Sequence, residues 1–253
     1  MAISKINSNA LGSTAKVNNL AKGSIAKINS LTNTTFSNTK SLDFDGVNDY
    51  VTADGIFGDI NVNTGTVSTW IKKDSTSAND VVFKFDVDSN NQVGIIYVNS
   101  SSILRYQYKA GGTTKTVDHS VSIEGDGNWH HIAITWDTSA DEMKAYLDGS
   151  QVGTTQSGLG TWSGTVNAFK IGMNSIASNG FWTGHIDQFS MFTSVVAIGT
   201  LYNSGTTPDL TGISNMIGWW QMEEGSGTTV ADSSGNSNTA TLVNGTAFAS
   251  DVA

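Results

Sequence analysis

Most of the chain alternates apolar and polar residues in short runs, and this pattern predicts β-strands. In residues 130–137, HHIAITWD, every second residue from Ile132 to Trp136 is large and apolar, so these side chains share one face of an extended chain. Clusters of Gly, Asn, Asp and Ser separate such runs and predict tight turns. The segments with this composition are residues 41–46, 50–53, 66–73, 80–87, 92–98, 103–110, 114–123, 129–137, 142–149, 168–173 and 185–192.

Helical periodicity is scarce by comparison. Only residues 194–204, SVVAIGTLYNS, are expected to form a short helix. Many short strands joined by tight turns are typical of two packed sheets. We therefore expect an all-β fold, a two-sheet antiparallel jelly-roll sandwich, preceded by an extended N-terminal arm.

That arm, residues 1–40, carries a Lys-Ile/Val-Asn unit that recurs every 11 residues. Asn, Ser, Thr and Gly surround these units and disfavour a helix. We interpret the segment as an arm that orders against a partner, each apolar residue filling a small pocket and each lysine meeting an acid. A disordered, soluble N-terminus is the alternative. The docking residues would be Lys5, Ile6, Lys16, Val17, Lys27 and Ile28.

Charge is distributed unevenly along the chain. Residues 1–42 hold five lysines and no acid, whereas the remaining 211 residues hold 8 basic and 22 acidic residues. Phosphate binding needs clustered Lys and Arg, so the acidic body argues against nucleic acid as a partner. The chain has no cysteine for a disulfide or a thiolate metal site. It also lacks an apolar run of about 18 residues and the apolar core of a signal peptide, so we expect neither membrane insertion nor signal-directed secretion.

Several ordered motifs carry a resemblance to a known fold. SLDFDGVNDYV, TVSTWIKK, NWHHIAITWD, KAYLDGSQVG, FKIGMNS and FWTGHIDQFSMF resemble, in this order, the laminin-G-like jelly roll of the concanavalin-A-like lectin/glucanase superfamily. The resemblance covers about residues 41–205. In many such modules a segment like MIGWWQMEEGSGTTVADSSG opens the domain, but here it follows the body, in residues 206–253. We expect this segment to complete the sandwich or to swap onto a neighbouring copy, with Trp219 and Trp220 on a strand near residues 41–46 that covers an otherwise exposed edge.

The repeat in front of a laminin-G-like body resembles structural proteins of tailed bacteriophages, especially those of marine and cyanobacterial hosts. This resemblance implies a non-enzymatic virion protein, a capsid decoration or a tail component, assembled in the host cytoplasm. Its partners would be other virion proteins, docked through the arm, and further copies of itself. A carbohydrate-binding adhesin for host-surface glycans is the alternative, and a glycoside hydrolase is the least favoured interpretation.

Catalysis finds little support in the residues. Glucanases of this superfamily carry a Glu-x-Asp-x-x-Glu pattern that sets two carboxyl groups at a defined separation. That pattern is absent, and the adjacent Glu223 and Glu224 would point to opposite faces of a strand. A Gly-x-Ser-x-Gly nucleophile elbow is absent as well. His130 and His131 alternate across a strand and so cannot both face one site. We expect no enzymatic activity.

A structural calcium ion is the one cofactor that the sequence suggests, although none is required. Asp43 and Asp45 share one face of the first strand of the body. Asp187 falls where the laminin-G-like pattern also carries an aspartate, and such modules often hold Ca²⁺ near one rim. The alternative is that these carboxylates cap turns through local N–H groups.

Sugar binding would use exposed aromatic side chains in loops. The candidates are Trp162, in GLGTWSG, and Phe181 and Trp182, which follow a Gly-containing loop. The alternative is that these rings plug the core beneath their loops. Trp70, Trp129 and Trp136 lie in strong strand motifs and are expected in the core.

Overall fold

A computed structural model describes residues 16–17, 20–21, 36–75 and 79–253 of the chain. The chain divides into two compact units, residues 1–37 and residues 38–253. In the first unit, β1 (Lys16–Val17) pairs antiparallel with β2 (Leu20–Ala21). The other arm residues proposed for docking, Lys5, Ile6, Lys27 and Ile28, lie outside the described residues.

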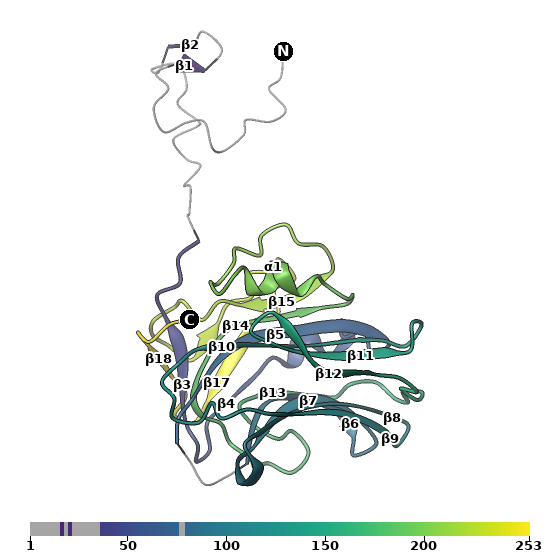
Figure 1. Ribbon diagram of the computed structural model, residues 1–253. Helices are drawn as coiled ribbons and strands as arrows, with labels where there is room; N and C mark the ends of the chain where they lie inside the picture. Colours follow the sequence, from purple (N-terminus) through teal and green to yellow (C-terminus); the bar gives the residue numbers. More distant parts are fainter. Residues whose placement is uncertain (1–15, 18–19, 22–35, 76–78) are drawn as a thin grey trace. The chain divides into compact units, whose positions relative to one another are not determined.

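The second unit, which we call the body, consists of two antiparallel sheets stacked face to face (Figure 1). Sheet 1 contains, in spatial order, β12 (Ser150–Gln156), β11 (Glu142–Leu147), β10 (His130–Asp137), β5 (Thr64–Lys73), β14 (Thr183–Phe192), β3 (Ser41–Asp45) and β18 (Ala247–Ala249), and β15 (Met216–Trp220) also pairs with β14. Sheet 2 contains β16 (Thr229–Val230), β17 (Ala240–Val243), β4 (Tyr50–Thr52), β13 (Ala168–Ile171), β6 (Asp80–Asp88), β7 (Asn91–Val98), β8 (Ile103–Ala110) and β9 (Thr113–Ser120). The expected two-sheet jelly roll is confirmed.

The core lies between the sheets and follows from the alternation of the strands. In β8, buried and half-buried residues alternate, so Leu104, Tyr106 and Tyr108 face the other sheet. Aromatic rings from both sheets meet there, because Phe83 and Phe169 of sheet 2 each contact Phe189 of sheet 1. The ring centroids are 5.4 and 5.7 Å apart, within the range of favourable aromatic pairs.

An ion pair crosses the same interior. The Nζ atom of Lys73, on β5, lies 2.8 Å from a carboxylate oxygen of Asp80, on β6, and both side chains are completely buried. Trp182 covers the pair, with its ring centroid 5.3 Å from the Lys73 ammonium. Removal of one partner would leave an uncompensated buried charge and would strongly destabilise the body.

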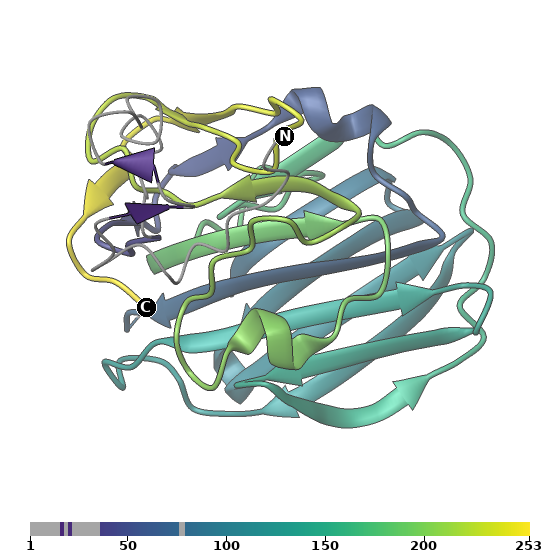
Figure 2. The same ribbon diagram turned by 90° about the horizontal axis from the view of Figure 1, so that it is seen from above.

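Short helical segments lie outside the sheets. They are α1 (Ile198–Tyr202), which confirms the expected helix in a shorter form, and the 3-10 turns η4 (Asp54–Gly58) and η5 (Asn99–Ser101). α1 lies over the outer face of sheet 1, where Tyr202 stacks on Trp70 (Figure 2). Within the described ranges, no helix has the length and apolar character needed to cross a membrane.

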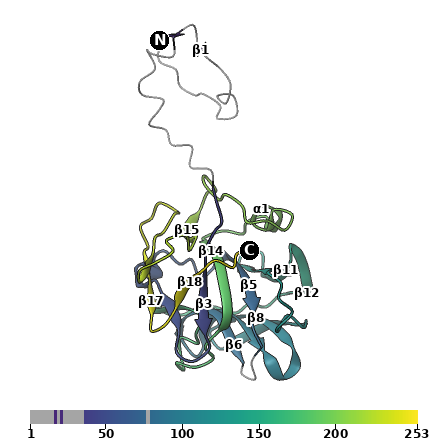
Figure 3. The same ribbon diagram turned by 90° about the vertical axis from the view of Figure 1, so that its left-hand side faces the viewer.

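The C-terminal segment completes sheet 1 differently from the sequence expectation. Trp219 and Trp220 do lie on a strand, but β15 pairs with residues 189–192 of β14 and not with β3. The free edge of β3 is covered instead by β18, in the register Phe248 opposite Leu42 (Figure 3). A bulge in β14 explains the difference, because β3 pairs before the bulge and β15 after it.

Candidate functional site

A row of side chains crosses the outer face of sheet 1. The position of the core tells which side chains belong to this outer face. On three adjacent strands, the completely buried residues are Leu42, Ile71 and Ile186. Because successive side chains of a strand point to opposite faces, their neighbours Asp43, Lys72 and His185 point away from the core. The sheet register sets Lys72 opposite His185, and His185 opposite Asp43, so the three lie at one level of the sheet.

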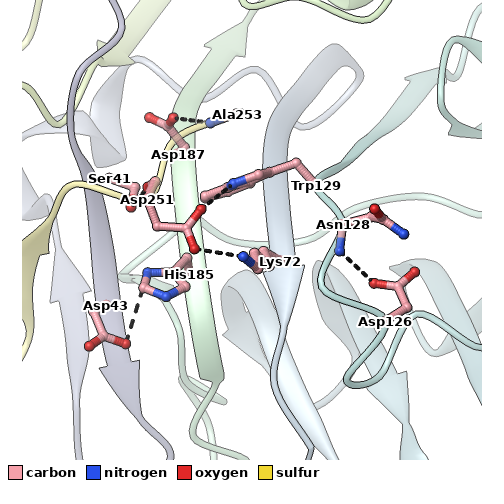
Figure 4. A network of polar contacts seen from close by, with 10 residues as sticks. All are labelled: Ser41, Asp43, Lys72, Asp126, Asn128, Trp129, His185, Asp187, Asp251 and Ala253. Atoms are coloured by element: carbon pink, nitrogen blue, oxygen red, sulfur yellow. Dashed lines mark hydrogen bonds and ion pairs between the residues drawn. The ribbon is translucent and has the colours of Figure 1, made fainter.

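Trp129 extends this row onto a fourth strand. His130, the first residue of β10, pairs with Ile71, so the preceding Trp129 continues the register toward Lys72. Its ring is only half buried, and its centroid lies 6.1 Å from that of His185. The expectation that Trp129 belongs to the core is therefore wrong, because Trp129 lies just before the first residue of β10 and on the outer face of the sheet. We call Trp129, Lys72, His185 and Asp43 the Trp129 row (Figure 4).

Asp251, from the tail that follows β18, ties this row together. One of its carboxylate oxygens accepts a hydrogen bond of 2.9 Å from the indole Nε1 of Trp129. The other lies 2.6 Å from the Nζ of Lys72. Burial raises the pKa of Asp251, but the hydrogen bonds from Lys72 and Trp129 outweigh this effect and hold that pKa below its ordinary value. The carboxylate thus stays charged and orients both side chains.

The opposite end of the row keeps free hydrogen-bonding capacity. The Nδ1 atom of His185 lies 4.0 Å from a carboxylate oxygen of Asp43, too far for a hydrogen bond. No described residue partners this covered nitrogen. The Asp43 side chain is 53% exposed, so its carboxylate faces solvent. A ligand hydroxyl group could bond to the exposed Asp43 carboxylate, beside the His185 ring.

A second histidine braces the loop beside Trp129. His130 lies between two carboxylates, with Nδ1 2.9 Å from Asp148 and Nε2 3.0 Å from Asp126. The hydrogen bond with Asp148 raises the pKa of His130; burial opposes this, and Asp126 adds to the rise. Asp126 also accepts the backbone N–H of Asn128, which fixes the loop that leads into Trp129 (Figure 4).

The two ends of the body meet next to the row. The carboxylate of Asp187 accepts hydrogen bonds from Asn38 Nδ2 at 2.9 Å and from the backbone N–H of Ala253 at 3.3 Å. Glu223 accepts hydrogen bonds from the backbone N–H groups of Thr39 and Lys40. These hydrogen bonds hold the first residues of the body, 38–40, against its C-terminal segment and β14.

This arrangement suits binding better than catalysis. A half-buried indole beside a carboxylate, an imidazole and an ammonium offers an apolar face and several donors and acceptors within one patch. The hydrogen bond of 2.7 Å between Ser68 and His131 is the nearest approach to a nucleophile–base pair that we find among the described residues. Both side chains are buried, and the Nδ1 of His131 has no partner in that part of the chain to orient it.

The three aspartates proposed for calcium take separate roles. Asp45 accepts the backbone N–H of Val47, as expected for a turn cap. Asp187 is completely buried and engaged with Asn38 and Ala253, whereas Asp43 points to solvent in the Trp129 row. In the ranges that the structure describes, no group of three or more His, Cys, Asp or Glu side chains is placed to hold a metal ion. Calcium binding stays a prediction.

The aromatic residues proposed for sugar stacking lie elsewhere in the fold. Trp182 is completely buried against Lys73, so a sugar cannot stack on it, and that expectation is wrong. Trp162 is half buried and packs on Phe85 and on Tyr108, with ring centroids 6.1 Å away in each case. Its loop brings the indole down onto the core. Phe181 is half buried and next to Trp182.

Sequence reasoning found only Asp43 of the Trp129 row. It assigned Trp129 to the core, and it missed Lys72, His185 and the neighbouring Asp251, because their grouping depends on which strands pair and in which register. One signal was present: Lys72 and His185 each interrupt an apolar strand motif with a polar residue next to a core residue. Such positions mark the outer face of a sheet once the inner face is known.

Comparison with known proteins supports the fold independently. The family described as the concanavalin A-like lectin/glucanases superfamily (Laminin_G_3) matches residues 45–197, more than half of the chain. The chain therefore belongs to the concanavalin A-like lectin/glucanase superfamily. No curated protein shows significant similarity to it.

Solved structures of low sequence identity share this fold. A proposed carbohydrate-binding protein from Bacteroides ovatus has 15% identity and a TM-score of 0.61, over 85% of this chain and 60% of its own length. A heptameric SAP-like pentraxin from Limulus polyphemus has 18% identity and a TM-score of 0.56, over 86% of this chain and 98% of its own. CBM40 of the Ruminococcus gnavus IT-sialidase, solved with α2,3-sialyllactose, has 12% identity and a TM-score of 0.56, over 68% and 100%.

Proposed function

We propose that the body is a non-enzymatic carbohydrate-binding module and that the Trp129 row is its binding surface. The observation that carries this proposal is the half-buried indole of Trp129, held by Asp251 beside the exposed carboxylate of Asp43 and the ring of His185. A pyranose ring could stack on the indole while its hydroxyl groups bond to the carboxylate and the imidazole. The names of the Bacteroides ovatus protein and of the sialyllactose-bound CBM40 are consistent with such a role on this fold.

A glycan array on the full chain tests this proposal through the variant Trp129→Ala. We expect the native protein to bind at least one glycan and the variant to bind it roughly 10-fold to 100-fold more weakly, the loss typical of one aromatic contact and its hydrogen bonds. Phe181→Ala is the matched control, since Phe181 is another half-buried aromatic residue outside the row. Binding that survives Trp129→Ala and is lost in Phe181→Ala would contradict the proposal.

We further propose that the N-terminal segment fixes this module to a larger particle, as a structural protein of a tailed-bacteriophage virion. The 11-residue repeat, its five lysines without an acid and the resemblance to phage structural proteins support this role. Further copies of the chain are proposed as partners.

Deletion of residues 1–35 tests the docking role. The body, residues 38–253, is a compact unit of its own, so we expect the shortened protein to stay folded and to lose incorporation into particles. A milder variant replaces Lys5, Lys16 and Lys27 by Ser and should reduce incorporation in a salt-dependent manner, since charge pairs weaken with ionic strength. Undiminished incorporation of both variants would refute an N-terminal dock.

A further inference from the structure

The outer face of sheet 2 gathers positive charge in an otherwise acidic body. Phe83 and Phe85 of β6 are completely buried in the core, so Lys84 between them points outward. The register sets Lys170 of β13 directly opposite Lys84 and, on the other side, Gly94 of β7. Lys109 of β8 faces the same way two strands further on, opposite Gln92. Three lysines therefore share one face with an acid of β6, Asp86, which pairs with Gln92.

Lys84 itself has almost no partner. Only 7% of its surface is exposed, yet its Nζ makes one long hydrogen bond, 3.3 Å, to the side-chain oxygen of Asn174. No acid among the described residues lies within ion-pair distance of it. Asp86, the nearest acid on the same strand, is held by a short hydrogen bond from Ser175. An ammonium group carries three donors, so most of its capacity is unused.

Lys170, which lies opposite Lys84, bonds to other residues and adds a like charge. Lys170 donates to Thr52 at 2.7 Å, lies 3.8 Å from Asp54 and covers the ring of Tyr50. Like charges directly opposite each other on paired strands destabilise a sheet. Burial lowers the pKa of Lys84; Asp86 opposes this, and Lys109 lowers it further. A negative charge added beside Lys84 would favour its charged form and would reduce its repulsion from Lys170 and Lys109.

A second buried polar atom lies on the same face. The side chain of Gln92 is 7% exposed, and its Oε1 has no hydrogen-bond partner in the described chain, while its Nε2 donates to Ser89. Gly94 lies between Lys84 and Gln107 in the register. A Cβ at Gly94 would lie 2.7 Å from the carbonyl oxygen of Phe83, so this position stays without a side chain. Gly94 therefore leaves room for the stem of Lys84, whose Cγ would lie 3.4 Å from such a Cβ.

We propose that the outer face of sheet 2 is a second ligand site, which takes the carboxylate of an acidic sugar against Lys84, with Lys170 and Lys109 on either side of it. The carboxylate adds a negative charge within reach of Lys84, which has no acid at ion-pair distance among the described residues, and Gln92 and Gln107 are placed to bond to sugar hydroxyl groups. This site is distinct from the Trp129 row, which lies on the other sheet. The ligand would be a uronic acid-containing glycan or another carboxylated one.

Titration calorimetry of the full chain with trigalacturonate tests this site. Its methyl ester is the matched probe, because it keeps the sugar and removes the charge. We expect trigalacturonate to bind the native protein, with an affinity that falls as salt is added. Its affinity should be at least 10-fold higher than that of the ester. We also expect sulfate to compete only at high concentration, since it lacks the sugar contacts. Equal binding of acid and ester, no binding of the acid, or sulfate competing at the same concentration as the acid would overturn the proposal.

Three variants locate the binding. Lys84→Met should weaken trigalacturonate binding roughly 10-fold to 100-fold without lowering the melting temperature, because it removes a buried charge and a like-charge pair. Lys144 is paired with Glu142 on sheet 1, so Lys144→Met should leave the affinity for trigalacturonate unchanged. Trp129→Ala should also leave this binding intact. Loss in Trp129→Ala with retention in Lys84→Met would overturn the second site while leaving the carbohydrate-binding proposal for the Trp129 row standing.

Discussion

The carboxylate of Asp187 lies between residues 38 and 253 of the body, and no cation pairs with it among the described residues. Its backbone neighbour Gln188 adopts a left-handed conformation, with φ at 51°, where the β14 bulge interrupts the sheet. This bulge lets Gln188 bond to Asn38 and accept the indole N–H of Trp219. Side chains at the bulge therefore hold the entry of the chain and β15 together.

Asp187 makes the stability of the body depend on pH. Burial raises its pKa from 3.8 to about 7, although the hydrogen bonds from Asn38 and Ala253 oppose this. The folded state thus holds a proton that the unfolded chain releases near pH 4, so this group lowers stability as pH rises from about 4 to about 7.

Asp187→Asn should remove that penalty. We expect the free energy of unfolding at pH 8 to rise by about 1–3 kcal/mol relative to native, with little difference at pH 4, as urea unfolding at the two pH values would measure. A variant that is destabilised equally at both values would mean that the carboxylate is held as an anion by its donors.

At the scale of strands and helices, the alternating pattern of the sequence predicted most of the secondary structure. Each of the eleven segments overlaps a strand of the two sheets, and residues 194–204 contain α1. The pattern works because it reports which face of a strand is buried, a local property. It could not report that Lys72 pairs with His185, because these residues lie on strands far apart in the sequence.

The same limit explains the errors in the candidate site. The buried position of Trp182 depends on the cross-sheet pair of Lys73 and Asp80, which no local pattern indicates. Trp129 looked like part of a core strand because it precedes an apolar run, yet β10 begins one residue later. The sequence indicates which residues alternate along a strand and what their chemistry is, but it does not indicate which distant residues they contact.

β18 protects an edge that the sheet would otherwise expose. It pairs with β3 through Ala247, Phe248 and Ala249, and the tail behind it carries Asp251. Deletion of residues 247–253 should lower the free energy of unfolding by about 2–4 kcal/mol, the sum of several lost hydrogen bonds, and should promote aggregation through β3. Urea unfolding and light scattering would measure both.

Asp251→Asn is the matched control for that deletion. It leaves β18 in place and weakens only the contacts with Lys72 and Trp129. It should cost stability less than the deletion and should not aggregate. Aggregation of the point variant to the same extent would show that the charge, and not the covered edge, keeps the protein in solution.

Across the body as a whole, the two sheets present different chemistry. The outer face of sheet 1 carries the Trp129 row with its indole and carboxylates, whereas the outer face of sheet 2 carries lysines and amides. A module with two such faces could bind a neutral part and an acidic part of host glycans independently. Attachment through the N-terminal segment would display many copies, and weak single contacts would then add up through multivalency.

Sugar binding at the Trp129 row can be followed directly through the tryptophan indole N–H resonances in NMR spectra. The native protein is titrated with the glycan that binds best on the array. We predict that the Trp129 indole and the His185 ring shift in a saturable manner, and that the indoles of Trp162 and Trp182 do not. Shifts confined to Trp162 and to residues around Phe181, with Trp129 unchanged, would contradict a binding surface on sheet 1.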